Sequence, residues 1–126
     1  MSNRLRAIPG GPAPIGPYSL AAEANGFVYL AGQAGVENDG SIPDSISDQT
    51  RRTMERLREV LEAMGLGFEN VVKTSIFLID MGDFAAMNEV YATYFDSDPP
   101  ARTTVAVAAL PLAGLKVEID MVASRT

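Results

Sequence analysis

The chain has 126 residues, a net charge of −6, and neither cysteine nor histidine. Hydrophobic residues make up 47% of it, enough for the core of one ordinary domain. This composition excludes disulfides, thiolate nucleophiles and iron–sulfur ligands, and it removes the commonest general base and metal ligand. The acidic balance argues against nucleic acid as the main partner, because that binding depends on clustered Lys and Arg.

The apolar segments give no sign of a membrane protein. Residues 1–6 are basic, but no apolar segment follows them, as it would in a signal peptide. The most apolar stretch, 105–115, is interrupted by Pro111 and Gly114 and is shorter than the roughly 20 residues of a membrane helix. We therefore expect a cytoplasmic protein that does not bind membranes.

The N-terminal segment predicts a short edge strand at 4–8 and then a loop at 9–17. The loop is too rich in Pro and Gly for regular structure. It is either a flexible linker or an ordered loop. We favour an ordered loop, because prolines reduce the entropy lost on ordering and because Ile15 and Tyr18 provide apolar anchors.

A β-hairpin is predicted next, with strands at 18–23 and 27–31. The dipeptide between them is Asn25-Gly26, in which both turn positions tolerate positive φ. Gly32 follows the second strand. A glycine at a strand end either marks a bulge or turn, or lets a ligand approach the backbone closely. The local pattern leaves both interpretations open.

A helix is predicted from an N-cap at Ser45 or Ser47 to a stop at Gly65 or Gly67. Its buried stripe recurs at helical spacing. The residues of this stripe are Ile46, Thr50, Met54, Leu57, Leu61 and Met64. The opposite face carries charged residues of both signs, which we interpret as a solvated surface without a function.

The middle of the chain predicts a strand at 70–80 and a second helix that starts after 81–83 and ends near Phe95. The strand is apolar on both faces, so both faces are expected to be covered, one by a helix and the other by a partner subunit. Asn88 lies on the second helix, where an amide is usually a surface residue and less often part of a pocket.

Arg102 follows two prolines and begins a β-branched strand at 102–109. Rigid backbone on both sides therefore sets its position. A guanidinium held in this way presents a planar fork of donors that suits a carboxylate or phosphate. The alternative is a structural ion pair that pins a loop or an interface.

The last strand, 115–122, alternates apolar and charged residues, and Glu118 lies on its charged face. Glu118 is either one of three solvated charges or a functional carboxylate. The element order β-β-α-β-α-β-β predicts an α+β domain: a mixed sheet with both helices on one face. The other face stays partly apolar, which favours an oligomer.

Several short segments, in this order and at this spacing, resemble the RidA/YjgF family of reactive-intermediate (enamine/imine) deaminases, formerly labelled endoribonuclease L-PSP. The segments are Ile15-Gly16-Pro17-Tyr18, Ala31-Gly32-Gln33, Val71-Val72-Lys73-Thr74, Asp83-Phe84 through Asn88 to Tyr91, Pro100-Ala101-Arg102 and Val117-Glu118-Ile119. The resemblance implies a chorismate-mutase-like fold, one domain over 1–126, no cofactor or metal, and a homotrimer with ligand sites between subunits.

The resemblance also implies roles for individual residues. Arg102 would clamp the carboxylate of a 2-imino or 2-enamino acid, and Glu118 would position or activate the attacking water. Tyr18 and Asn88 would line the substrate cleft, and backbone near Gly32 would supply polar contacts.

Two further substrate-binding positions differ from the family pattern. Ala31 stands where a serine is common, and Thr104 stands where a cysteine is common. Both differences bear on substrate preference more than on the basic chemistry. At residue 31, the backbone groups are unaffected by the change to alanine.

The implied reaction is the hydrolysis of 2-enamino and 2-imino acids, such as 2-aminoacrylate, to 2-oxo acids and ammonia, which protects pyridoxal-phosphate enzymes. The residues leave three alternatives: a module of the same fold that binds small carboxylates without turnover, an endoribonuclease, and a chorismate mutase. An acidic chain without histidine makes the second a poor fit. The third would need several cations near its dianionic substrate, and fold analogy alone is weak support.

Overall fold

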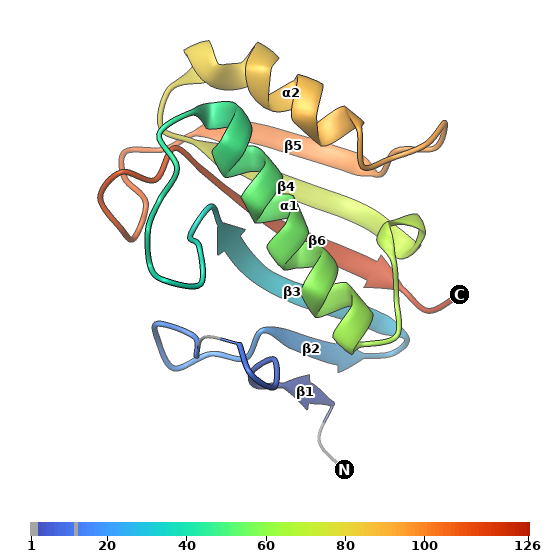
Figure 1. Ribbon diagram of the computed structural model, residues 1–126. Coiled ribbons are helices and arrows are strands. Elements are labelled where there is room, and N and C mark those ends of the chain that lie inside the picture. The colour runs from blue at the N-terminus through green and yellow to red at the C-terminus, as the bar shows by residue number, and fades with distance from the viewer. Residues whose placement is uncertain (1–2, 12) are drawn as a thin grey trace.

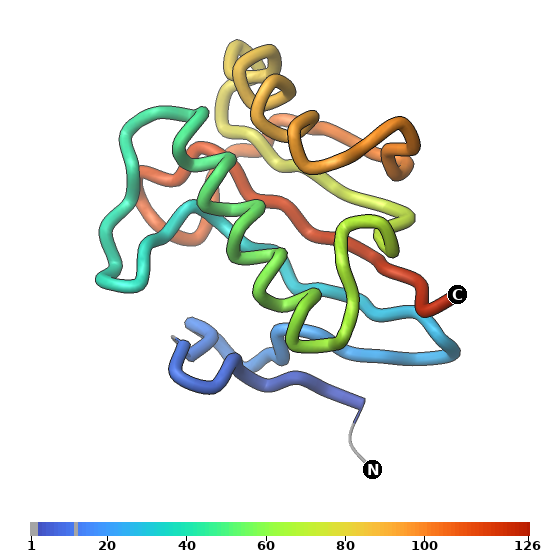
Figure 2. The backbone as a smooth tube through the Cα atoms, turned by 45° about the vertical axis from the view of Figure 1, so that its right-hand side comes forward, coloured from blue at the N-terminus to red at the C-terminus, as the bar shows by residue number. Residues whose placement is uncertain are grey.

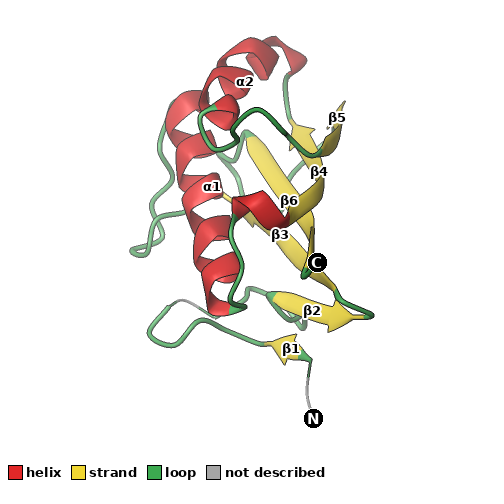
Figure 3. Cartoon of the chain, turned by 90° about the vertical axis from the view of Figure 1, so that its right-hand side faces the viewer, coloured by secondary structure: helices red, strands yellow, loops and turns green. Residues whose placement is uncertain are grey.

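The computed structural model describes residues 3–11 and 13–126, which form a six-stranded sheet with two α-helices on one of its faces (Figures 1 and 3). The strands are β1 (Arg4–Leu5), β2 (Ala21–Ala24), β3 (Phe27–Ala34), β4 (Val71–Leu78), β5 (Ala101–Ala106) and β6 (Val117–Ser124). The helices are α1 (Ile46–Ala63) and α2 (Phe84–Ala92), with single 3-10 turns η1 (Phe68–Asn70) and η2 (Met81–Asp83). The predicted α+β architecture is confirmed, with β1 as the short edge strand.

The C-terminal strand lies in the middle of the sheet. The strand order is β1-β2-β3-β6-β4-β5, so β6 separates β3 from β4 (Figure 2). β6 is antiparallel to both neighbours, whereas β4 and β5 are parallel and are joined through α2. A parallel pair needs such a long crossover connection. The sheet is therefore mixed, as the element order predicts.

The predicted local signals operate where expected. Asn25 and Gly26 have φ angles of 53° and 82°, the two positive values that a tight hairpin turn requires. Ser45 caps α1, and its hydroxyl accepts a hydrogen bond from the Asp48 N–H at 3.0 Å. Gly65, with φ of 75°, ends the same helix in a left-handed conformation.

α2 ends at Ala92, three residues before the predicted end at Phe95. The Thr93 hydroxyl donates to the Val90 carbonyl at 2.7 Å, and the Thr93 N–H bonds the same carbonyl at 3.1 Å. This tightened final turn closes the helix. The chain then runs through 96–100 to β5, which begins at Ala101, one residue before the predicted strand.

The core lies between the sheet and the helices. Val117, Ile119 and Met121 of β6 are at most 1% exposed and point toward α1, whereas Glu118 and Asp120 point to the other face. The predicted alternation in β6 is therefore confirmed. Within the described residues, no helix is long and apolar enough to cross a membrane.

Gln49 is a fully buried polar residue that the predicted stripe of α1 does not include. Its amide donates to the carbonyls of Pro43 and Gly114, and its carbonyl accepts from the Lys116 N–H, all within 2.9 Å. Gln49→Leu would leave these three buried groups unpaired, so we expect a loss of about 3 kcal/mol in the free energy of unfolding. Urea titration measures it; the exposed neighbour Arg51→Gln should change stability by less than about 0.5 kcal/mol.

Candidate active site

A bulge in β3 shapes the backbone at the predicted substrate-binding segment. Leu30 pairs with Met121 and Gln33 pairs with Ile119, so Ala31 and Gly32 together face one residue of β6, Asp120. Bulges of this kind bend a strand and redirect its side chains, often beside active sites. The first of the two interpretations of Gly32, a bulge, is therefore confirmed; the approach of a ligand to its backbone stays a prediction.

The group that approaches Gly32 is the side chain of Glu118. A Cβ atom at position 32 would lie 2.5 Å from Glu118 Oε2 and 3.0 Å from its Cδ, so only glycine leaves room for this carboxyl. Burial raises the pKa of Glu118, and the neighbouring charge of Asp120 raises it further. A raised pKa makes a carboxylate a better proton acceptor near neutral pH.

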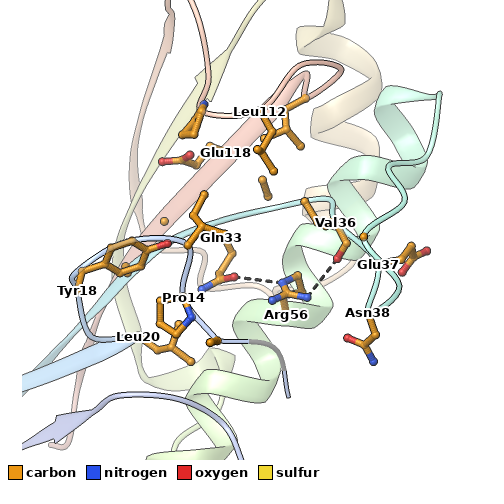
Figure 4. A pocket seen from close by; sticks show the side chains of 18 residues that line it. Pro14, Tyr18, Leu20, Gln33, Val36, Glu37, Asn38, Arg56, Leu112 and Glu118 are labelled. Atoms are coloured by element: carbon orange, nitrogen blue, oxygen red, sulfur yellow. Dashed lines mark hydrogen bonds between the residues drawn. The ribbon is translucent and has the colours of Figure 1, made fainter. Parts of the chain in front are cut away.

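Glu118 and Gly32 line a cavity of about 680 Å³, which we call the Glu118 pocket (Figure 4). It opens between the loop at 13–18, the bulge of β3, the middle of α1 and the loop at 111–115. Its polar wall is formed by Tyr18, Gln33, Glu37, Asn38, Arg56 and Glu118. The structure thus brings together four predicted residues: Tyr18, Ala31, Gly32 and Glu118.

Gly32→Ala tests whether the placement of the Glu118 carboxyl matters. The new Cβ would displace the flexible end of Glu118 and leave the backbone in place, so we expect kcat/KM to fall about 10²-fold with little change in melting temperature. Gly35→Ala is the matched control, because its Cβ would meet the Gln49 backbone at 2.8 Å and should lower the melting temperature. Equal activity of Gly32→Ala and wild type would contradict the assigned role of Glu118.

Arg102 lies in a different place, between β5 and α2. Its guanidinium carbon is 5.4 Å from the ring centre of Phe84 and 5.1 Å from that of Tyr91. Such cation–π contacts orient the guanidinium and leave its N–H groups available. None of the ion pairs within residues 3–11 and 13–126 includes Arg102. The alternative of a structural ion pair within this chain is therefore not observed for the described residues.

Asn88 and Thr104 accompany Arg102, and we call the three residues the Arg102 site. Asn88 shares a face of α2 with Phe84 and Tyr91, at spacings of four and three residues. Thr104 is two positions beyond Arg102 on the same face of β5. Asn88 Oδ1 and Thr104 Oγ1 are buried and have no hydrogen-bond partner among the described residues. Buried polar atoms without partners are rare and indicate places for water or a ligand.

The predicted residues therefore form two groups that do not meet within one chain. Arg102 points to the helix-covered face of the sheet, where it contacts α2. Glu118 points to the open face, as its alternation with Val117 and Ile119 requires. Arg102, Asn88 and Thr104 are not among the residues that line the Glu118 pocket, so within one subunit the predicted constellation is divided between two separate places.

Arg56 and Gln33 are polar residues of the Glu118 pocket that were not predicted from the sequence. Arg56 Nε donates to Gln33 Oε1 at 3.2 Å, and one terminal nitrogen donates to the Val36 carbonyl at 3.1 Å. The sequence does contain an indication that Arg56 has a special role. Arg52 and Arg56 are like charges four residues apart at the border of the α1 stripe, and this spacing is unfavourable in a helix unless one of the two has a partner elsewhere. Within the described residues, no cluster of acidic side chains could hold a metal ion.

Comparisons with known proteins agree with this geometry. The family model described as Endoribonuclease L-PSP matches residues 10–125. The chain is 44% identical to Reactive Intermediate Deaminase A, chloroplastic, of Arabidopsis thaliana over 90% of its own length and 61% of that protein's length. It is 42% identical to the 2-iminobutanoate/2-iminopropanoate deaminase of Mus musculus, over 89% of this chain and 84% of that protein.

A solved structure, E. coli TdcF with bound serine, has the same fold. It superposes with a TM-score of 0.90 at 34% sequence identity, and the match covers 98% of this chain and 99% of that one. At this identity and coverage the family is shown and not only the fold. The chain belongs to the RidA/YjgF family, whose members include proteins named reactive intermediate deaminase and 2-iminobutanoate/2-iminopropanoate deaminase.

Proposed function

We propose that this protein hydrolyses reactive 2-imino and 2-enamino acids, such as 2-aminoacrylate, to 2-oxo acids and ammonia. The observation that carries the proposal is the half-buried Glu118 carboxyl, held against Gly32 at the edge of a cavity with its pKa raised by burial. The deaminase names of the relatives support the same class of reaction.

The reaction needs little catalytic machinery, because an imine is already electrophilic. Water adds to the carbon of the protonated imine while Glu118 accepts one of the water protons, which gives a neutral carbinolamine. Glu118 returns this proton to the nitrogen, and ammonia leaves while the carbinolamine hydroxyl gives its proton to Glu118, which forms the 2-oxo acid. The balance is one imino acid and one water consumed, and one 2-oxo acid and one ammonia formed. An enamine enters after tautomerisation to its imine.

The substrate carboxylate is assigned to Arg102. Its guanidinium is oriented by Phe84 and Tyr91 and presents a planar fork that matches a carboxylate. Asn88 Oδ1 and Thr104 Oγ1, which lack partners among the described residues, supply further polar contacts there. Serine, the molecule bound in the E. coli TdcF structure, is a small amino acid with such a carboxylate.

A second copy of the chain is needed to bring Arg102 to Glu118, and we propose a homotrimer with sites between subunits. The open face of the sheet and its edges carry several large exposed apolar side chains. They include Phe27, Tyr29, Val72, Ile79 and Val105, which are 40% to 49% exposed. An apolar surface of this kind is typical of an interface. It is also where Glu118 emerges, so a neighbour packed there could place its Arg102 at the Glu118 pocket.

A coupled assay tests the activity. Addition of the protein to a pyridoxal-phosphate dehydratase acting on serine should accelerate the release of 2-oxo acid and ammonia from the enamine product. The control is the same assay with Glu118→Gln. If wild type gives no acceleration and calorimetry still detects binding of small carboxylates, the protein is a binding module. Salt-sensitive cleavage of RNA by the purified protein would instead favour the endoribonuclease description.

A subunit-mixing experiment tests the shared site. Arg102→Ala subunits and Glu118→Gln subunits are each expected to be inactive, but random trimers of the two would place an intact Arg102 beside an intact Glu118 at about a quarter of their interfaces. We therefore expect about a quarter of wild-type activity after unfolding and refolding the mixture. Separate refolding of each variant is the control. No recovery in mixed trimers would show that the two residues do not serve one site.

A further inference from the structure

The Glu118 pocket contains a cation that the proposed reaction does not use. Arg56 reaches into the pocket wall from α1 and is held by Gln33 and Val36 (Figure 4). These two hydrogen bonds occupy Nε and one N–H of a terminal nitrogen. Because a guanidinium has five N–H donors, three remain for a ligand. Arg56 is thus fixed in orientation and still able to bind.

No carboxylate of the described residues forms an ion pair with Arg56. The neighbouring Arg52 pairs with Glu37 at 2.9 Å and with Glu59 at 3.9 Å, whereas no ion pair involving Arg56 is found in residues 3–11 and 13–126. Burial lowers the pKa of Arg56, and the charge of Arg52 lowers it further, while Glu59, Glu37 and Tyr18 act in the opposite direction. A half-buried cation beside another cation is a favourable place for an anion.

We propose that Arg56 forms a second anion subsite, which binds the side-chain carboxylate of acidic substrates. The inference rests on the proposed deaminase function and names its substrate class: 2-imino acids with two carboxylates, of the size of the imines of aspartate and glutamate. Arg102 of a neighbouring subunit would hold the carboxylate beside the reacting carbon. Arg56, in the same pocket as Glu118, would hold the carboxylate at the other end.

The shape of the pocket favours a substrate longer than 2-aminoacrylate. At about 680 Å³ the cavity is in the range that accommodates drug-sized ligands, far beyond the need of a three-carbon imino acid. Its wall also includes apolar side chains such as Leu20, Val36 and Leu112, which suit the methylene groups between two carboxylates. A guanidinium with adjacent free N–H groups binds a carboxylate in a bidentate manner, which favours a carboxylate over a hydroxyl at this end.

The test compares two substrate classes in Arg56→Gln. Flavin amino-acid oxidases generate the imines of aspartate and of leucine in situ, and semicarbazide captures whatever imine the protein does not hydrolyse. Arg56→Gln removes the charge but keeps a side chain that can hydrogen-bond Gln33. We expect kcat/KM for the dicarboxylic imine to fall about 10- to 100-fold, with the leucine imine changed less than about twofold. Arg51→Gln, an exposed position on the same helix, is the matched control and should change neither.

Equal losses for both substrates would show that Arg56 only supports the pocket wall, and would overturn the proposal. Arg56→Lys adds a second criterion, since it keeps the charge without the planar fork and should retain part of the preference for the dicarboxylic imine. A lack of any selectivity between the two imines in wild type would also overturn it.

Binding measurements separate this proposal from the proposed function. Succinate should bind more tightly than butyrate in calorimetry, and Arg56→Gln should remove the difference. If this holds but no imine is hydrolysed, the deaminase function fails and the anion subsite stands. If imines are hydrolysed but succinate and butyrate bind alike, the subsite fails and the deaminase function stands. Competition by inorganic phosphate as strong as by succinate would show a general anion site and would overturn the assignment to dicarboxylates.

Discussion

Replacement of Arg102 by alanine is expected to lower kcat/KM about 10²- to 10³-fold, one of the two largest losses that we expect for a single change in this protein. The guanidinium is the group assigned to the substrate carboxylate, and loss of a charge-assisted bidentate contact removes both binding and orientation. The loss should appear mostly in KM for small imino acids, because the carboxylate is bound in the ground state as well as in the transition state. Steady-state kinetics with 2-aminoacrylate released by a dehydratase measures it.

The fold should survive this substitution. Arg102 contributes cation–π contacts with Phe84 and Tyr91, so Arg102→Ala should reduce the free energy of unfolding by only about 1 kcal/mol. Arg102→Lys keeps a positive charge over the same rings, so it distinguishes the effect of the charge from the effect of the planar donor geometry. We expect this variant to retain only a small part of the activity, because an ammonium lacks the planar fork. Full activity in Arg102→Ala would refute the carboxylate clamp.

Glu118→Gln is expected to reduce kcat about 10²-fold or more while KM changes little. The amide keeps the size of the side chain against Gly32 but cannot accept the proton of the attacking water. Single-turnover measurements separate this chemical step from binding. Asp120→Asn is the matched control, because Asp120 is the neighbouring carboxyl on the same face of β6 and has no assigned chemical role. A comparable loss in both variants would indicate a general electrostatic effect.

The raised pKa of Glu118 makes two signed predictions. Activity should increase with pH through an apparent pKa above the ordinary glutamate value, because the base acts only when ionised. Stability should change in the opposite direction: the folded state binds this proton more tightly than the unfolded state, so ionisation of Glu118 destabilises the fold as pH rises through the raised pKa.

Glu118→Gln should therefore be slightly more stable than wild type at pH 7, and the difference should vanish at about pH 3.5, below the ordinary glutamate pKa of about 4.3. The carboxyl is only half-buried, so solvent screening limits the gain to less than about 1 kcal/mol. Thermal melts of both proteins at the two pH values test this. A variant less stable than wild type at pH 7 would show that the carboxylate contributes to folding.

The local structure of this chain follows from short sequence signals. The Asn25-Gly26 turn, the Ser45 cap and the left-handed Gly65 each form where the residue type predicts, because positive φ and capping depend on neighbours within a few residues. The alternation in β6 is confirmed for the same reason, since successive side chains in a strand must take opposite faces. The resemblance to the family also holds along the whole length, from residue 10 to residue 125.

Polar residues with distant partners could not be found in this way. Gln49 looks like an ordinary helix-surface residue, and only the tertiary structure places Pro43 and Gly114 beside its amide. Arg56 lies at the border of the α1 stripe, where the sequence indicates no partner, and only the tertiary structure places Gln33 and Val36 beside its guanidinium. The burial of a polar side chain depends on the segments that pack over it. A local sequence pattern does not indicate which segments these are.

By itself, the sequence determined the elements, their order and the likeness to one family, and that likeness implies the roles of clamp and base that we propose for Arg102 and Glu118. Only the tertiary structure decided that these two residues lie on opposite faces of the sheet and that Arg102 does not line the Glu118 pocket. The alternation within a strand shows which of its residues lie on the same face. It does not show which face of one strand lies on the same side of the sheet as a given face of another strand. That matching depends on the register of β6 against β3 and β4, which is set by long-range hydrogen bonds and by the bulge at Ala31 and Gly32.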